Sequence, residues 1–242
     1  MYSQYLTDWG GDMLEIDDLV IEQDAFRLRA QARVAEGRKV VIMGASGAGK
    51  STLVAAIAGF VTQKSGSIRW KGDRIDYLEP AARPIAMLFQ DGNLFPHLTV
   101  AQNVALGLGP SLKVTKESTK KVEDALGQVG LSGFGLRKPG TLSGGEQSRA
   151  ALARILIMAR PILVMDEPFS ALGPAMRVEM LDLVRTILER TGATLLMVSH
   201  DPKDAWAIAD DLIVVAEGTA HQYHDAKAVL ADPPPALSAY LG

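Results

Sequence analysis

The chain has 242 residues, of which 48% are hydrophobic and 22% are charged, and its formal net charge is −3. This length and composition exclude a disordered or fibrous protein, and they suffice to bury a core without disulfides or metals. The charge disfavours nucleic acid as a partner, and the lack of cysteine excludes a disulfide scaffold, a zinc finger and a thiol nucleophile.

The N-terminal segment, residues 1–13, carries neither the positive start nor the apolar core of a secretory signal. We expect it to be an extension, because the first strand-like residue is Leu14. Further along the chain, no apolar run approaches the roughly 18 residues that a membrane helix needs. A membrane role would therefore depend on a partner.

The next elements are predicted from periodicity. Residues 14–34 alternate loosely between apolar and polar, which is typical of half-buried antiparallel strands. An apolar run at 39–43 predicts a buried strand, and 50–58 predicts a helix. Ser65 and Gly66 predict a turn before a strand at 67–70, and a further strand is expected at 85–89.

A helical region interrupts this pattern. Residues 99–129 have helical periodicity, and we assign residues 91–142 to a helical subdomain. Alternation then returns, with helices predicted at 145–159 and 174–190 and strands at 162–165, 194–198 and 212–215. Such alternation favours a mainly parallel sheet covered on both faces. The expected α/β core comprises residues 14–90 and 143–242.

A glycine-rich segment links the predicted strand at 39–43 to the helix at 50–58. Residues 44–51 read GASGAGKS and fit the pattern G-x-x-x-x-G-K-[ST]. Glycines let backbone N–H groups turn inward around an anion, and the helix start adds about half a positive charge. Lys50 can reach β- and γ-phosphates, and Ser51 can ligate Mg²⁺. The flanking elements favour a phosphate-binding loop over a glycine-rich turn that binds nothing.

Two carboxylates follow the apolar run at 162–165. In an α/β sheet, ligands bind beyond the carboxyl ends of the strands. Asp166 is therefore placed to hold Mg²⁺ through water, and Glu167 to orient or deprotonate an attacking water. Adjacent acids are otherwise most often a solvated turn. The phosphate loop in the same chain favours the catalytic interpretation.

A second anion site is predicted before the helix at 145–159. Ser143 and Glu146 fit a capping box. Gly144 and Gly145 weaken a helix but allow close backbone approach. A hydroxyl, free N–H groups and a helix dipole describe a phosphate receptor. The alternative is a well-capped helix with no ligand.

Four segments, GASGAGKST, LSGGEQ, ILVMDEP and VSHD, occur in an order and spacing that resembles the ATP-binding cassette (ABC) ATPases over about residues 14–231. The resemblance implies a P-loop NTPase ABC cassette, with a RecA-like core, an antiparallel β subdomain and a helical subdomain. It also implies that two copies stack head to tail around ATP. The implied nucleotide-binding residues are Gly44, Ala45, Ser46, Gly47, Ala48, Gly49, Lys50, Ser51 and Thr52, and, from the opposite copy, Ser143, Gly144, Gly145 and Glu146.

The same resemblance assigns the chemistry. Mg²⁺ would be held by Ser51, Gln90 and Asp166, and the catalytic residues would be Glu167, His200 and Gln90. His200 matches a histidine that contacts the γ-phosphate. Gln90 matches a glutamine that ligates Mg²⁺ or water and senses the transmembrane partner. Without the resemblance, a lone glutamine after a strand would be interpreted as a loop residue.

The remaining histidines have no expected role. His97 is predicted to lie in a loop. His221 and His224 are three apart in a polar tail, and a pair in such a tail is not expected to bind a metal.

Departures from the family's usual pattern affect the predicted site. Gly173 replaces the aspartate of the usual SALD segment, which predicts altered coupling between the two copies rather than altered nucleotide binding. The aromatic residue that stacks on adenine would fall near Gln23, where the nearest aromatic is Phe26. Phe26 is equally consistent with a core residue.

Residues 83–90 and 93–104 are similar to the binding-protein-dependent importer branch, and with the following LGLGPSLKV they are most similar to thiamine importer ATPases. This implies ATP hydrolysis at the cytoplasmic face of the inner membrane, where permease subunits would hold the chain and a periplasmic or extracellular binding protein would deliver the solute. Importers of iron(III), polyamine or another small solute are alternatives. So are a soluble non-transport ABC ATPase and a non-hydrolysing scaffold.

Overall fold

The computed structural model describes residues 13–90, 92, 94–109 and 115–241. The predicted N-terminal extension therefore lies outside the described residues, apart from Met13, which is buried and begins the first strand. Asp91, the first residue of the predicted helical subdomain, also lies outside them. The domain boundaries remain a prediction.

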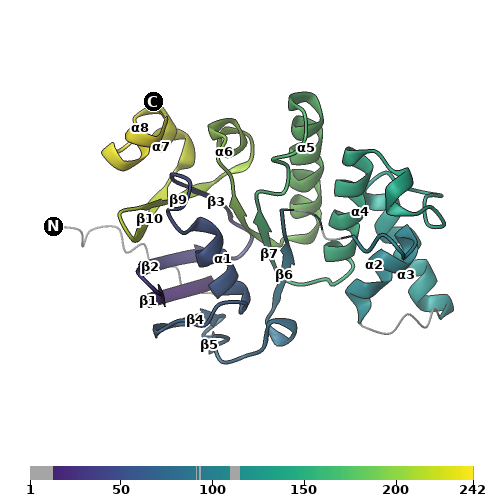
Figure 1. Cartoon of the computed structure of the whole chain (residues 1–242), viewed down its shortest axis with the longest axis horizontal. Helices are drawn as coiled ribbons and strands as arrows, with labels where there is room; N and C mark the ends of the chain where they lie inside the picture. Colours follow the sequence, from purple (N-terminus) through teal and green to yellow (C-terminus); the bar gives the residue numbers. More distant parts are fainter. Residues whose placement is uncertain (1–12, 91, 93, 110–114, 242) are drawn as a thin grey trace.

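One mixed sheet of ten strands runs through the described part of the chain in the order β5-β4-β1-β2-β10-β9-β3-β8-β7-β6 (Figure 1). The strands are β1 (Met13–Gln23), β2 (Phe26–Ala35), β3 (Lys39–Met43), β4 (Ser65–Trp70), β5 (Asp73–Arg74), β6 (Ile85–Leu88), β7 (Ile162–Asp166), β8 (Thr194–Val198), β9 (Asp211–Ala216) and β10 (Thr219–His224).

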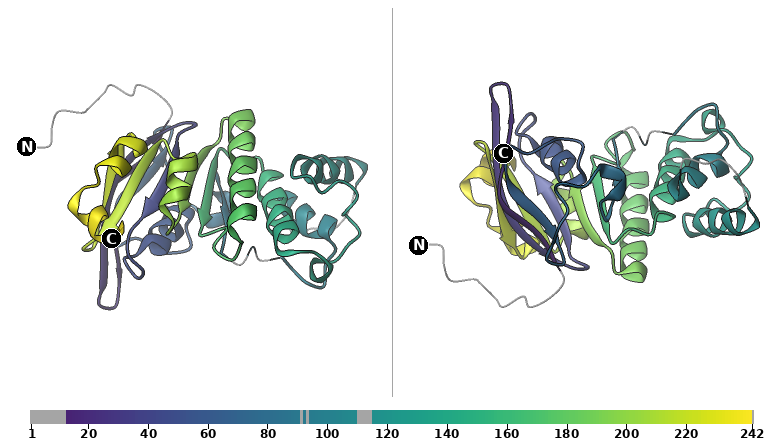
Figure 2. Two further views of the ribbon diagram at one scale, coloured as in Figure 1. Left: turned by 90° about the horizontal axis from the view of Figure 1, so that it is seen from above. Right: turned by 90° about the horizontal axis from the view of Figure 1, so that it is seen from below.

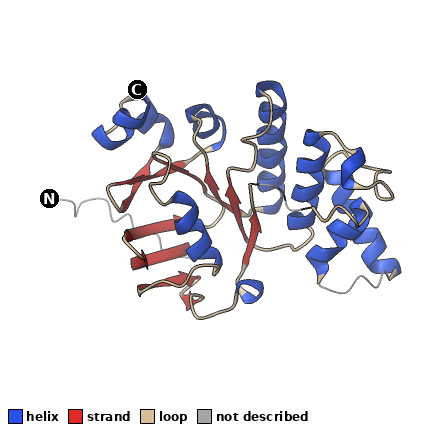
Figure 3. Ribbon diagram, viewed as in Figure 1, coloured by secondary structure: helices blue, strands red, loops and turns tan. Residues whose placement is uncertain are grey.

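Helices surround this sheet, as Figure 3 shows by colour. They are α1 (Lys50–Ala58), α2 (Val100–Ala105), α3 (Lys116–Gln128), α4 (Gly144–Leu156), α5 (Pro174–Thr191), α6 (Pro202–Ile208), α7 (Ala226–Ala231) and α8 (Pro235–Leu241), with 3₁₀ turns at Pro80–Ala82, Leu106–Leu108 and Pro139–Thr141.

The sheet has a parallel half and a largely antiparallel half. Strands β9, β3, β8, β7 and β6 pair in parallel, whereas β1 pairs antiparallel with β2 and β4. In β2 the buried residues alternate with exposed ones, whereas β8 is buried along its whole length. This difference follows from coverage, because a parallel strand is packed on both faces and an antiparallel strand commonly on one.

Alternate residues of the parallel strands enter two hydrophobic clusters. Val40 and Ile42 of β3 join the cluster that contains α1 and the antiparallel strands. Val41 and Met43 join the other cluster, with α4, α5 and α6. The two-residue period of a strand thus divides the core between the faces of the sheet.

Helices α2, α3 and α4 gather at one end of the molecule in every view (Figures 1 and 2). Helix α4 packs on α2 and α3 and also on β6 and α5, so it joins this end to the sheet. Thr99 caps α2 with a reciprocal hydrogen-bond pair to Gln102.

The predicted turn at Ser65 and Gly66 is wrong, because both residues belong to β4. A Cβ on Gly66 would lie 2.4 Å from the carbonyl oxygen of Asp18, at an irregularity in the pairing of β1 with β4. The glycine therefore marks a close backbone approach at a bulge, not a turn.

Several C-terminal elements were not predicted. Strand β10 has one buried residue, Ala220, so it carries no apolar pattern. It pairs with both β9 and β2, and His221 and His224 belong to this strand rather than to a tail. Helices α6, α7 and α8 have only six or seven residues each.

Candidate functional site

The loop at residues 44–49 joins β3 to α1. Gly44 has φ 145°, and a Cβ there would lie 2.2 Å from the carbonyl oxygen of Val215. Gly49 has φ 104°, and a Cβ there would lie 2.4 Å from the ring of Phe26. Packing and conformation both require glycine at these two positions. A Cβ on Gly47 would meet nothing within 4 Å, so the middle of the loop is open to a ligand.

Lys50 is the first residue of α1, and only 6% of its surface is exposed. Its ammonium donates hydrogen bonds to the carbonyl oxygens of Gly44, at 2.8 Å, and Ala45, at 2.9 Å. Burial lowers the pKa of Lys50, while Glu167 and Asp166 oppose the shift. The cation therefore lies inside the curve of the loop, within the field of both carboxylates.

Asp166 ends β7, two strands away from β3 in the sheet. Its Oδ1 accepts a 3.0 Å hydrogen bond from the hydroxyl of Ser51, in the first turn of α1. Burial raises the pKa of Asp166, and Glu167 adds to the shift, whereas Ser51 and Lys50 oppose it. A hydroxyl and a carboxylate at this separation form a hard-oxygen donor set that suits Mg²⁺.

Glu167 follows directly and adopts a left-handed backbone, with φ 45°. Its N–H donates to the carbonyl oxygen of Val198, at 3.1 Å. Its Oε2 lies 3.4 Å from Nδ1 of His200, which is half exposed just beyond β8. A left-handed non-glycine residue costs on the order of 1–3 kcal/mol. Here it turns the carboxylate toward the histidine.

Residues that the sequence analysis missed hold the loop around His200. Arg177 of α5 forms a bidentate ion pair with Asp204 of α6, with N–O distances of 2.7 and 2.6 Å. The Ser199 hydroxyl donates to Asp204 at 2.6 Å and accepts a hydrogen bond from the N–H of Asp201 at 3.0 Å. No sequence motif marks this pairing, because the partners are 27 residues apart on two helices.

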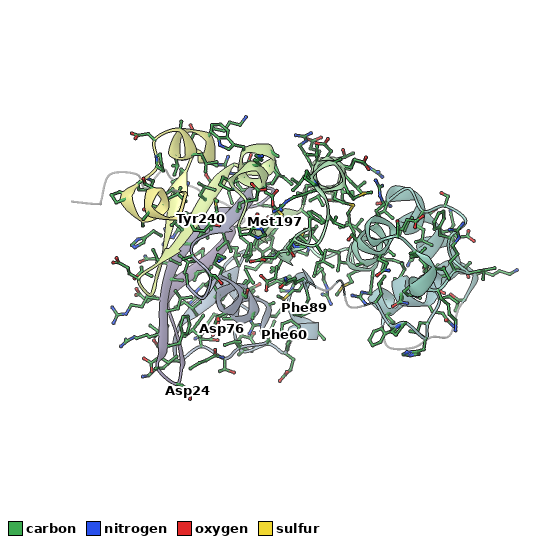
Figure 4. All side chains as sticks on the ribbon, turned by 45° about the horizontal axis from the view of Figure 1, so that its top comes forward. Asp24, Phe60, Asp76, Phe89, Met197 and Tyr240 are labelled. Carbon is green, nitrogen blue, oxygen red and sulfur yellow. The ribbon has the colours of Figure 1, made fainter. Side chains whose placement is uncertain are left out.

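Gln90 is exposed just after β6. Its side-chain amide lies 3.5 Å from the hydroxyl of Ser170, which in turn donates to the carbonyl oxygen of Glu167 at 3.1 Å. The rings of Phe60 and Phe89 meet edge to face beside it, with centroids 5.3 Å apart (Figure 4). Gln90 is thus connected to the segment after Glu167 rather than directly to Ser51 or Asp166.

A cleft of about 490 Å³ opens beside Gln90. Its lining includes Leu94, Pro168, Leu172 and Gly144. The cleft therefore separates the sheet end that carries Glu167 from the helical end of the molecule.

The predicted capping box at the start of α4 is confirmed. The N–H of Ser143 donates to Glu146 at 2.7 Å, and the N–H of Glu146 donates to the Ser143 hydroxyl at 3.3 Å. The hydrogen bond from the Ser143 backbone lowers the pKa of Glu146. A Cβ on Gly145 would meet the sulfur of Met176 at 2.6 Å, whereas one on Gly144 would meet only Leu172, at 3.9 Å. A side chain at Gly145 would thus force the end of Met176 to move, and Gly144 is the open position.

The structure does not bring the two predicted phosphate receptors together. Helix α1 packs on β6, β7 and β8, whereas α4 packs on α2, α3, β6 and α5. Strands β6 and β7 lie between the two helices in Figure 1. One copy of the chain therefore presents the loop at 44–51 and the start of α4 as separate surfaces.

The residues considered for adenine lie next to the loop. Gln23 is exposed at the end of β1, and Phe26 is half buried at the start of β2 with its ring against Gly49. Phe26 also packs against the hydrophobic cluster of α1. Adenine stacking by either residue remains a prediction.

His97 packs its ring against Phe95. His224 Nδ1 lies 3.3 Å from Asp211, which also forms an ion pair with Arg38. Among the described residues, no group of three or more histidines, aspartates and glutamates is arranged to hold a metal ion. In the same part of the chain, none of the helices combines the length and the apolar character needed to cross a membrane.

The chain is similar to known proteins along most of its length. The family model described as ABC transporter matches residues 29–170. The thiamine import ATP-binding protein ThiQ of Ruegeria sp. (strain TM1040) is 53% identical over 230 residues, which cover 95% of this chain and 100% of that protein.

The chain also resembles solved structures of ATP-binding cassettes. The ADP conformation of the ATP-binding cassette MJ1267 is 26% identical with a TM-score of 0.85, over 96% of this chain and 99% of that chain. The dimeric post-hydrolysis state of the cassette MJ0796, bound to ADP and Pi, is 27% identical with a TM-score of 0.75, over 88% and 98% respectively.

Proposed function

Because the chain belongs to the ABC transporter family, we propose that it is the ATP-hydrolysing subunit of a thiamine importer and that a second copy completes its catalytic site. Family membership confirms the predicted fold class, a P-loop NTPase ABC cassette, and the predicted coupled ATPase activity. The single observation that carries the choice of solute is the similarity to a thiamine import protein over 95% of this chain.

Binding of ATP is assigned to the loop and the residues that follow it. The N–H groups of residues 44–52 and the start of α1 would surround the β- and γ-phosphates. Lys50, already inside the loop, would exchange its two carbonyl partners for phosphate oxygens. Ser51, Asp166 and Gln90 would hold Mg²⁺, which when bound neutralises phosphate charge.

Hydrolysis is assigned to Glu167 and His200. The Glu167 carboxylate would orient a water and accept its proton as the oxygen attacks the γ-phosphorus and the bond to ADP breaks. His200, 3.4 Å from that carboxylate, would donate a hydrogen bond to a γ-phosphate oxygen. Both groups extend from the ends of adjacent strands, β7 and β8, so the sheet fixes their relative positions.

A second copy would supply the missing half of the site. Ser143 and Gly144 are exposed at the start of α4, and a Cβ on Gly144 would meet only Leu172, at 3.9 Å. In a two-fold pair, the start of α4 of one copy would cover the phosphates bound by the other. The dimeric ADP-bound structure of MJ0796 supports this arrangement.

The permease would dock in the cleft beside Gln90. From there, a change in the contact between Gln90 and Ser170 would reach the backbone of Glu167. Binding to the permease would hold the chain at the cytoplasmic face of the inner membrane, while a periplasmic or extracellular binding protein delivers the solute to the permease.

Reconstitution tests this function. The chain is combined in proteoliposomes with the permease that co-purifies with it and the matching binding protein, and uptake of labelled thiamine, iron(III) and spermidine is measured with and without ATP. We expect ATP-dependent uptake of thiamine alone, abolished by Glu167→Gln. Uptake of iron(III) or spermidine instead of thiamine would contradict the assigned solute.

A further inference from the structure

The C-terminal helix reaches the loop that carries His200. The hydroxyl of Tyr240, in α8, donates a 2.5 Å hydrogen bond to the backbone carbonyl oxygen of His200, 40 residues earlier. We call residues 199–201 the switch loop. Tyr240 is labelled in Figure 4, and Figure 1 shows α7 and α8 beside α6.

Helix α8 is firmly seated. Leu237 is fully buried, and the helix packs on β9. The N–H groups of Leu237 and Ser238 both donate to the carbonyl oxygen of Pro234, which fixes the first turn. The position of Tyr240 is therefore set by the core.

The Tyr240 hydroxyl stays a donor at neutral pH. Burial raises the pKa of Tyr240, and the negative charges of Glu167 and Asp201 act in the same direction. The phenol thus remains protonated beside the two carboxylates and can continue to bind the His200 carbonyl.

The switch loop is held on a second side by α5 and α6. Asp204 accepts hydrogen bonds from Ser199 and Arg177. Both charged side chains are largely buried, because only 14% of the Arg177 side chain and 4% of the Asp204 side chain are exposed. Those contacts hold Ser199 and Asp201, while the contact from α8 holds His200 itself. The imidazole of that same residue lies 3.4 Å from Glu167.

We propose that Tyr240 is a positioning residue for ATP hydrolysis, which fixes the main chain of His200 so that its ring faces Glu167 and the γ-phosphate. This inference rests on the proposed function, because it requires that Glu167 and His200 act on ATP. Its physical basis is preorganisation, since a group held in its working geometry need not be ordered during the reaction.

The test compares Tyr240→Phe with the wild-type chain at full length. The control is Tyr223→Phe, which removes the hydroxyl of a tyrosine that packs on the same hydrophobic cluster from β10. For Tyr240→Phe we expect kcat to fall about fivefold, while KM for Mg-ATP stays unchanged and the melting temperature falls by no more than about 4 °C. Hydrogen exchange should quicken in peptides that contain residues 199–201. The control should match wild type in every measurement.

A second background shows whether the effect passes through His200. In His200→Ala, assayed by single-turnover hydrolysis with excess protein, adding Tyr240→Phe should cause no further loss. An unchanged kcat in Tyr240→Phe, a fivefold loss that persists in His200→Ala, or a loss that tracks a lower melting temperature would overturn this inference alone. A wild-type chain that hydrolyses no ATP would overturn the proposed function and this inference with it.

Discussion

The hydroxyl of Ser51 donates a 3.0 Å hydrogen bond to the carboxylate of Asp166, although 115 residues separate them. Ser51 lies in the first turn of the helix after the phosphate loop, and Asp166 ends the strand that leads to Glu167. The contact therefore joins the segment that we propose binds phosphate to the segment that we propose activates water.

Asp166→Asn should reduce Mg-ATP hydrolysis at least about 100-fold, because an amide is a poor substitute for a carboxylate as a metal ligand. Asparagine keeps an oxygen that can accept the hydrogen bond from Ser51, so the fold should be retained. Without nucleotide and metal, the variant should melt at a higher temperature than wild type at neutral pH, since a buried charge is removed.

The sign of this effect follows from the raised pKa of Asp166. The Asp166 carboxyl binds its proton more tightly in the folded chain than in the unfolded chain. The stability that this protonation contributes is present in acid and is lost as the pH rises through the folded pKa. The stability gap between variant and wild type should therefore widen from about pH 4 to about pH 7. Melting curves across this range measure it, and a variant less stable than wild type at neutral pH would refute the explanation.

Lys50→Met should weaken ATP binding by at least about tenfold, because it removes the cation that we propose contacts the phosphates. Methionine retains most of the apolar stem, which keeps the buried site filled. Titration with a fluorescent ATP analogue measures the affinity. Lys64→Met is the matched control, since Lys64 is mostly exposed and pairs with Glu22. Equal affinities of the two variants would exclude the assigned role of Lys50.

Gly173→Asp should change turnover more than ATP affinity. Gly173 is the N-cap of α5, and a Cβ there would meet nothing within 4 Å. An aspartate fits the backbone and would cap the helix, adding roughly 0.3 kcal/mol to the free energy of unfolding. Steady-state kinetics of Gly173→Asp and of the control Gly173→Ala separate the carboxylate from the methyl group. Unchanged kinetics would count against a coupling role for this position.

Arg177→Met should lower the free energy of unfolding by about 3–5 kcal/mol, because it leaves the buried carboxylate of Asp204 without its partner. The double variant Arg177→Met with Asp204→Leu should recover much of this loss, since neither charge is then left unpaired. Urea unfolding of the three proteins measures both values. If the single variant lost less than about 1 kcal/mol, the pair would be no more important than a surface salt bridge.

The sequence predicted the elements that carry the site because their patterns are local. The loop at 44–51 and the pair Asp166 and Glu167 each follow a continuous apolar strand, and such strands are recognisable when both faces are buried. The strand pattern placed Glu167 at a strand end, whereas His200 was singled out by the resemblance to ABC ATPases, and the order of the strands brings the two side chains together.

Local sequence patterns did not predict the long-range contacts that short elements make. Strand β10 is half exposed and lacks alternation, so nothing in its residues indicates pairing with two strands. The contact of Tyr240 with His200 and the pair Arg177 and Asp204 depend on how helices pack. The role of Gly145 in making room for Met176 is likewise visible only once α4 and α5 are placed.

If two copies share each ATP site, blocking hydrolysis should trap the pair, and sedimentation of Glu167→Gln measures this. With Mg-ATP, this variant should form a dimer of twice the 25.9 kDa chain mass and retain unhydrolysed ATP. Adding Gly144→Trp, which places a bulky group on an open surface of its own chain, should keep it monomeric. Hydrolysis by Glu167→Gln at the wild-type rate would rule out Glu167 as the base, and a variant that stays monomeric with ATP bound would rule out the shared site.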